Sequence, residues 1–171
     1  VHADVGIALD GDGDRLVMVD HLGRIADGDQ LLYVIASDRK RAGTLQGPVV
    51  GTVMSNLGLE QKLQAEGVEF LRAKVGDRYV LAMLKEHGGV LGGETSGHLL
   101  CLDRTTTGDG LVSALEVLAV MKRTGRPLAE LVAGMPKFPQ VMINVRVRER
   151  IDPCTSRTCS EPARWCRVSI F

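Results

Sequence analysis

Short apolar runs alternate with longer amphipathic stretches along most of the chain. The apolar runs, whose length is typical of buried strands, lie at 5–9, 16–19, 48–53, 69–73, 90–91 and 99–102. Apolar side chains that recur every three or four residues predict helices over about 28–41, 57–66, 78–87 and 110–124, with a short helix after Pro127. Strands that alternate with amphipathic helices predict an α/β fold, with a mixed, largely parallel sheet flanked by helices.

Four polar residues stand where the predicted helices begin: Asp27, Asn56, Asp77 and Asp109. An Asp or Asn side chain at such a position accepts hydrogen bonds from the free N–H groups of the first turn. We therefore expect each of them to cap a helix.

Two further expectations concern the burial of helical residues. In the helix that follows Asp109, four apolar residues at helical spacing are expected to face the core: Leu111, Leu115, Leu118 and Met121. At the end of the first helix, the charged run 38–41 is expected to be solvated, because its basic residues complement the helix dipole there.

The run Asp10–Arg15 (DGDGDR) lies between the first two apolar runs. Its two glycines accept backbone conformations that curl the chain, so Asp10, Asp12 and Asp14 can converge on one point. Three anionic oxygen donors suit Mg²⁺. Arg15 cannot help a cation, but it can hold a phosphate that the cation also contacts. The loop therefore indicates phosphoryl chemistry.

Two other interpretations of this loop were open from the residues alone. A calcium-binding EF-hand loop also begins with alternating aspartates, but it needs glycine at position six and glutamate at position twelve. Here Arg15 and His21 hold those positions, which excludes an EF-hand. A solvated acidic turn remains the alternative to a magnesium site.

A second glycine-rich loop, Gly92–His98, carries Glu94, Ser96 and His98 at alternating positions. These side chains can share one face and offer groups that bind sugar hydroxyls or a phosphate oxygen. A tight turn with incidental polar residues is the alternative.

The loop Lys74–Arg78 lies between a predicted strand and a predicted helix. In α/β folds, ligands bind at the carboxyl ends of strands, and a helix start favours an anion. Lys74 adds a positive charge there. A solvated surface pair involving Asp77 is an equally good interpretation of these residues.

Composition narrows the functional class. The 171 residues carry 21 basic and 21 acidic side chains, so no basic field favours nucleic acid or a membrane surface. No apolar run is long enough to span a bilayer, and there is no signal peptide pattern. Cys101 lies in an apolar run and is expected to be a reduced core residue, whereas Cys154, Cys159 and Cys166 lack zinc-ligand spacing. We expect a cytoplasmic protein.

With these loops described, a family resemblance is evident. Asp10–Arg15 resembles the metal loop of the α-D-phosphohexomutases, and Gly92–His98 is similar to their sugar-binding loop. Within that family, three further stretches resemble the bacterial phosphoglucosamine mutases: Lys74–Val80, Thr107–Gly110 and Pro139–Val145. The resemblance covers about residues 3–148.

The resemblance implies a fold, a reaction and a set of site residues. Such enzymes have four domains and interconvert glucosamine 6-phosphate and glucosamine 1-phosphate, for UDP-N-acetylglucosamine synthesis. They use a phosphoserine, one Mg²⁺ per active site, and glucosamine 1,6-bisphosphate or glucose 1,6-bisphosphate as the activating intermediate. The residues implied to hold Mg²⁺ are Asp10, Asp12 and Asp14. Those implied near the phosphoryl group or the reacting oxygen are Arg15, His98 and Lys74. Those implied to bind the sugar phosphate are Glu94, Ser96, His98 and Asp77.

The sequence also departs from the family pattern. The phosphoserine belongs to the family's first domain, which this chain lacks, and the fourth domain's Ser-Gly-Thr-Glu-Pro loop is matched only by Ser160–Pro162. We expect residues 1–24 to end domain two with the metal loop and 25–138 to form domain three with the sugar loop. Residues 139–148 would begin domain four, and 149–171 would be an aberrant, unstructured tail. The chain by itself is expected to be inactive.

Two functional alternatives stay open at this point. A sister phosphomannomutase or phosphoglucomutase would use the same loops on a different hexose phosphate. A non-catalytic truncated product would keep the loops and lose the reaction. In each case the expected partner is a phosphosugar, with neither nucleic acid nor a membrane, and a homodimer of the full-length enzyme is left open.

Overall fold

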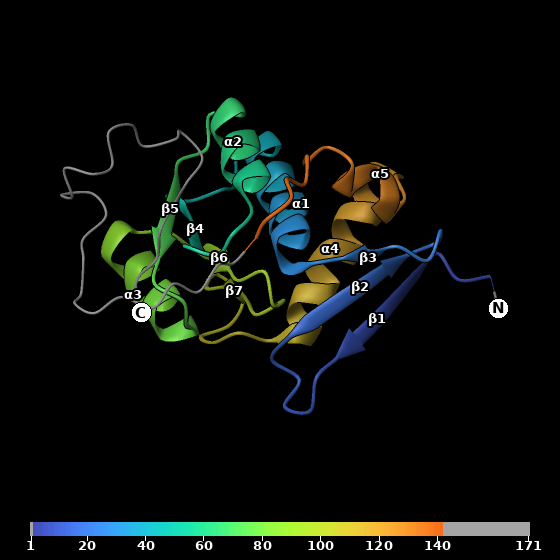
Figure 1. Cartoon of the computed structure of the whole chain (residues 1–171), viewed down its shortest axis with the longest axis horizontal. Helices are drawn as coiled ribbons and strands as arrows, with labels where there is room; N and C mark the ends of the chain where they lie inside the picture. Colours follow the sequence, from blue (N-terminus) through green and yellow to red (C-terminus); the bar gives the residue numbers. More distant parts are fainter. Residues whose placement is uncertain (1, 142–171) are drawn as a thin grey trace. The chain divides into compact units, whose positions relative to one another are not determined.

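Seven strands and five helices follow one another along residues 2–141, the part of the chain that this computed structural model describes (Figure 1). The chain up to Phe138 forms one compact unit, and a second unit begins at Pro139. Of the second unit only residues 139–141 are described. The expectations for 142–148 and for the tail 149–171, with three of the cysteines, therefore lie outside the described residues.

The first three strands form an antiparallel sheet in the order β1-β2-β3. They are β1 (Val5–Leu9), β2 (Leu16–Asp20) and β3 (Ile25–Ala26). Leu9 pairs with Leu16, so the acidic run between them is the connecting loop of a β-hairpin. Leu16 and Met18 on β2 are fully buried in the main core, whereas Ile7 and Leu9 on β1 are 44% and 43% exposed. The hairpin is thus anchored through its second strand.

The second sheet has the order β5-β4-β6-β7. Its strands are β4 (Val49–Thr52), β5 (Phe70–Ala73), β6 (Leu91–Gly93) and β7 (Leu99–Cys101). The first three in spatial order run parallel, and β7 pairs antiparallel with β6. The sheet is therefore mixed and partly parallel, which confirms the predicted α/β fold.

Helices cover both faces of the second sheet (Figure 1). They are α1 (Gly28–Arg41), α2 (Leu57–Ala65), α3 (Asp77–His87), α4 (Gly110–Thr124) and α5 (Leu128–Val132). On one face, Val80 and Leu84 of α3 pack against Val50 of β4. On the other face, α1, α2 and α4 enclose the larger core, to which the neighbouring Val49 belongs. Among residues 2–141, no helix has both the length and the apolar character that crossing a bilayer requires.

The predicted helix caps are confirmed at three of four positions. Asp27 and Gln30 form a reciprocal capping box at the start of α1, and Asn56 and Asp109 accept backbone hydrogen bonds at the starts of α2 and α4. Asp77 is different. The cap of α3 is Gly76, and Asp77 is already the first helical residue, so the prediction that its side chain caps the helix is wrong.

The predicted buried stripe of α4 is wrong at its first two positions. Leu111 and Leu115 are 58% and 55% exposed, whereas Leu118 and Met121 are partly buried and pack against the main core. The buried residues are smaller or β-branched: Gly110, Ser113, Ala114, Val117 and Val120. The start of α4 lies directly against the metal loop, which favours small residues on its buried face. A Cβ on Gly110 would lie 2.8 Å from the carbonyl oxygen of Gly13.

The charged end of α1 is not uniformly solvated, contrary to expectation. The Arg39 side chain is only 7% exposed, and its guanidinium lies 2.9 Å from both Asp103 Oδ1 and Glu116 Oε2. Asp38 is buried as well and pairs with Arg123. Arg39 therefore links α1 to α4 and to the loop after β7.

We expect Arg39→Ala to lower the free energy of unfolding by about 2–3 kcal/mol, because it leaves two half-buried carboxylates without their best partner. Arg104 contacts the same two carboxylates but is 56% exposed. Arg104→Ala, the matched control, should cost less than about 1 kcal/mol. Urea unfolding of both variants measures the difference, and equal losses would contradict this assignment.

Candidate functional site

The loop between β1 and β2 brings three carboxylates together. One oxygen each from Asp10, Asp12 and Asp14 lies within 4.8 Å of the others. The turn is closed by hydrogen bonds from Gly13 N to Asp10 O (3.2 Å) and from Arg15 N to Asp10 Oδ1 (3.3 Å). Gly13 has a φ of +73°, a value that side-chain-bearing residues rarely adopt.

The donor set of this loop fits Mg²⁺. Its oxygens are hard and anionic, the kind that Mg²⁺ prefers, and they lie within 4.8 Å of one another. Desolvation raises the pKa of Asp10, but hydrogen bonds from the Arg15 backbone N–H and with Asp14, together with the Arg15 charge, outweigh it and lower that pKa. Asp10 is therefore an anion at neutral pH. The Arg15 side chain is 56% exposed, with its Nε 3.9 Å from Asp10 Oδ2.

The glycine-rich loop between β6 and β7 faces the loop before α3. Glu94 Oε1 accepts a hydrogen bond of 2.7 Å from Gly76 N, and Ser96 Oγ lies 3.3 Å from Glu94 Oε2. These contacts place two of the predicted sugar-binding residues beside the Lys74–Arg78 loop. The sequence alone does not indicate this meeting, because the residues are 18 positions apart.

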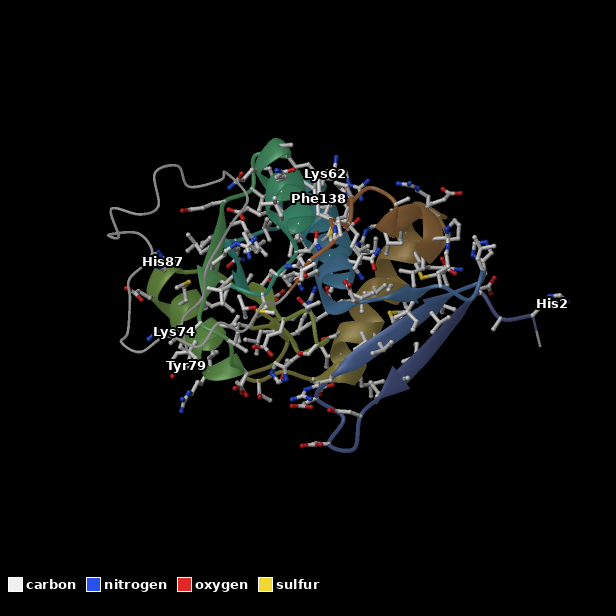
Figure 2. The ribbon with its side chains drawn as sticks, in the orientation of Figure 1. His2, Lys62, Lys74, Tyr79, His87 and Phe138 are labelled. Carbon is white, nitrogen blue, oxygen red and sulfur yellow. The ribbon has the colours of Figure 1, made fainter. Side chains whose placement is uncertain are left out.

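Lys74, on the loop before α3, and Asp77, the first residue of α3, are both exposed. Figure 2 labels Lys74 and Tyr79, which lie near each other. The Lys74 ammonium lies 5.9 Å from the centre of the Tyr79 ring, and the Arg78 guanidinium lies 4.7 Å from it. Within the described residues, no hydrogen bond or ion pair joins Lys74 or Asp77 to the metal loop. They border the sugar loop and do not contact the carboxylate cluster.

The metal loop and the sugar loop are joined directly. Leu16 N donates to Gly97 O at 3.0 Å, and Arg15 forms an antiparallel β-bridge with His98. The His98 side chain is buried, and its Nδ1 lies 3.1 Å from Asp14 Oδ2. His98 thus contacts a carboxylate of the metal loop. The role near the substrate that the family resemblance implies for His98 stays a prediction.

Asp29 was not identified from the sequence. Its side chain is fully buried in the first turn of α1, where Oδ2 accepts hydrogen bonds from Asn56 N (2.7 Å) and Thr95 Oγ1 (2.8 Å). Gly28 N also donates to Thr95 O, so the start of α1 holds the sugar loop. Burial raises the pKa of Asp29 despite these donors. Acidic residues are common in first helical turns, so no sequence signal distinguishes this one.

Comparison with known proteins identifies relatives of this chain. Residues 27–138 match the family model described as phosphoglucomutase/phosphomannomutase, alpha/beta/alpha domain III. The chain is 63% identical over 150 residues to a phosphoglucosamine mutase of Methylococcus capsulatus. The aligned residues make up 88% of this chain and 34% of that protein. It is 60% identical over 162 residues to a phosphoglucosamine mutase of Alkalilimnicola ehrlichii, and the aligned residues make up 95% of this chain and 36% of that protein.

A solved structure shows the same architecture. A phosphoglucomutase/phosphomannomutase family protein from Burkholderia thailandensis superposes with a TM-score of 0.72 at 32% identity, over 80% of this chain and 30% of that one. The chain spans about a third of the length of the relatives named above.

We expect Asp29→Asn to change how stability depends on pH. Because the native pKa of Asp29 lies above the unfolded value of 3.8, the native state binds more protons than the unfolded state between these two values. Wild-type stability therefore falls as pH rises through that window, and the asparagine variant lacks this loss. The stability of the variant relative to wild type should rise with pH and then level off.

Urea unfolding across the acidic to neutral range measures this difference, with the exposed Asp4→Asn as control. Parallel curves for wild type and Asp29→Asn would show that burial does not perturb this carboxyl.

Proposed function

Because the chain belongs to the phosphoglucomutase/phosphomannomutase family, we propose that it supplies the metal-binding and sugar-binding loops of a phosphoglucosamine mutase. Such an enzyme interconverts glucosamine 6-phosphate and glucosamine 1-phosphate. The observation that carries the proposal is the direct joining of the two loops, through Leu16 N and Gly97 O and through Asp14 and His98. A phosphoryl group held at one loop would then meet a sugar held at the other.

The proposed role of the metal loop follows from its charges. Asp10, Asp12 and Asp14 would hold Mg²⁺, which when bound neutralises charge on a phosphoryl group. Arg15 reaches into solvent beside these carboxylates and can hold a phosphate oxygen through charge-assisted hydrogen bonds. Phosphoryl transfer depends mainly on positioning and on electrostatic stabilisation, which this loop supplies.

The proposed role of the other two loops is to hold the sugar phosphate. Glu94 and Ser96 can bind sugar hydroxyls, since a carboxylate offers more lone pairs than its contact with Gly76 N uses. Lys74, on the adjoining loop, and Asp77, at the start of α3, are exposed, so Lys74 can attract a phosphate and Asp77 can accept from a hydroxyl.

The phosphoserine and the bisphosphate intermediate are proposed by analogy with the family. A phosphoserine from another domain would exchange its phosphoryl group with the sugar through the 1,6-bisphosphate, so the chain by itself should not turn over. A cytoplasmic location stays part of the proposal. The family description and the Burkholderia thailandensis structure also favour a second candidate, a phosphomannomutase or phosphoglucomutase.

We expect Asp12→Asn to weaken Mg²⁺ binding by about tenfold or more, because it removes one of three anionic ligands. The shifts of the backbone amides of residues 10–15 during a Mg²⁺ titration, followed by NMR, measure the affinity. Asp4→Asn, which removes an equally exposed charge outside the cluster, should leave it unchanged. Equal weakening by both variants would reduce the site to a general acidic surface.

We expect mutase activity to appear when this chain replaces the matching segment of the Methylococcus capsulatus enzyme. The chimera, this chain alone, and the chimera with Asp12→Asn are assayed on glucosamine 6-phosphate with Mg²⁺ and a trace of the 1,6-bisphosphate. Activity is expected in the unsubstituted chimera only.

The substrate class is read from the same chimera. Glucose 6-phosphate and mannose 6-phosphate serve as hydroxyl-bearing competitors of the amino sugar. Faster reaction with either of them would favour the second candidate. A folded chimera without activity on any of the three would reject a catalytic role, and turnover by the chain alone would reject the need for an external phosphoserine.

A further inference from the structure

The backbone around His98 is fixed against the strand that leaves the metal loop. His98 forms the β-bridge with Arg15, its carbonyl oxygen accepts from Glu94 N at 3.0 Å, and the preceding Gly97 accepts from Leu16 N. A Cβ on Gly97 would lie 2.1 Å from Leu16 O, so the two backbones are in the closest contact that glycine allows. The position of the His98 ring is therefore set by both loops at once.

Among residues 2–141, a single polar partner of the His98 ring is found. Its Nδ1 lies 3.1 Å from Asp14 Oδ2, with 7% of the His98 side chain exposed and 36% of the Asp14 side chain. A carboxylate oxygen only accepts hydrogen bonds, so Nδ1 carries the proton and donates it. His98 Nε2 is buried and has no hydrogen-bond partner in the described part of the chain.

The far side of the ring is closed by Gly108. A Cβ on Gly108 would lie 2.2 Å from His98 Nε2 and 2.4 Å from its Cε1, which leaves no room for a substrate atom there. The imidazole is thus turned toward Asp14 and covered on the opposite edge. This placement suits a group that holds another side chain, and it does not suit a group that exchanges a proton with substrate.

Of the three aspartates, Asp14 is contacted by a side chain of the sugar loop. Asp10 is oriented by the Arg15 backbone N–H, whereas Asp14 receives the imidazole from the other loop, 84 residues away. Hydrogen bonds from neighbouring groups orient metal-binding carboxylates, and their loss typically weakens metal binding about 10- to 100-fold.

We propose that His98 is a positioning residue, which holds the Asp14 carboxylate in its metal-binding orientation through the proton on Nδ1. The inference rests on the proposed magnesium site. It replaces the expected contact of His98 with the substrate by a contact with a metal ligand, and it makes the sugar loop part of the metal site.

The test compares two substitutions in this chain. His98→Asn places an amide nitrogen near the position of Nδ1 and keeps a donor toward Asp14, whereas His98→Gln places its amide near Nε2. Mg²⁺ titrations followed by the amides of residues 10–15 should show about tenfold or greater weakening for His98→Gln, and His98→Asn should stay close to wild type. Protection of the Leu16 amide from exchange, which reports the join to Gly97, should persist in both variants.

A second measurement needs no substitution. The long-range ¹H–¹⁵N spectrum of the wild-type imidazole should show a proton on Nδ1, and an imidazole with Nδ1 unprotonated would overturn the inference even if a variant fails to fold. Wild-type affinity in His98→Gln, or equal weakening in both variants, would also overturn it while leaving the magnesium site intact. Absence of Mg²⁺ binding by wild type would instead reject the proposed site, and the role of His98 with it.

Discussion

The close approach of two backbone segments, at Leu16 and Gly97, is the constraint on which the candidate site depends. Only a residue without a Cβ fits there, because Gly97 has a φ of +93° and lies against the Leu16 carbonyl. The hydrogen bond across this contact contributes only about 1 kcal/mol. Burial of Leu16 and Met18, at about 2 kcal/mol each, is what keeps β2 in place. Hydrophobic burial thus supplies the stability, and the glycine contact sets the register between the loops.

The sequence was informative where the cause of a structure is local. The strands and most helix ends follow from periodicity and from caps such as Asp27 and Asp109, whose partners lie within one helical turn. It failed where the cause is distant. Arg39 is buried because Asp103 and Glu116 come to it from 64 and 77 residues away. Leu111 and Leu115 are exposed because α4 begins close to the metal loop, which favours small residues on the buried side of that end.

The same distinction applies to the site. The three aspartates of the metal loop could be recognised because their spacing in one short hairpin loop already brings them together. The partners of His98 and Glu94 could not, because each contact is made by backbone geometry between separate loops. Asp29 was missed for the same reason, since its importance lies in Asn56 and Thr95 and not in its own neighbours.

The separation of 84 residues between Asp14 and His98 has a consequence for synthesis. The β1–β2 hairpin closes through local pairs within microseconds of emerging. At translation rates of 5–20 residues per second, the residues that complete its acidic loop follow roughly 4–17 s later. During that interval three aspartates and an open-edged strand are held without their long-range partners. The metal loop can therefore take its local shape several seconds before the residue that contacts Asp14 is synthesised.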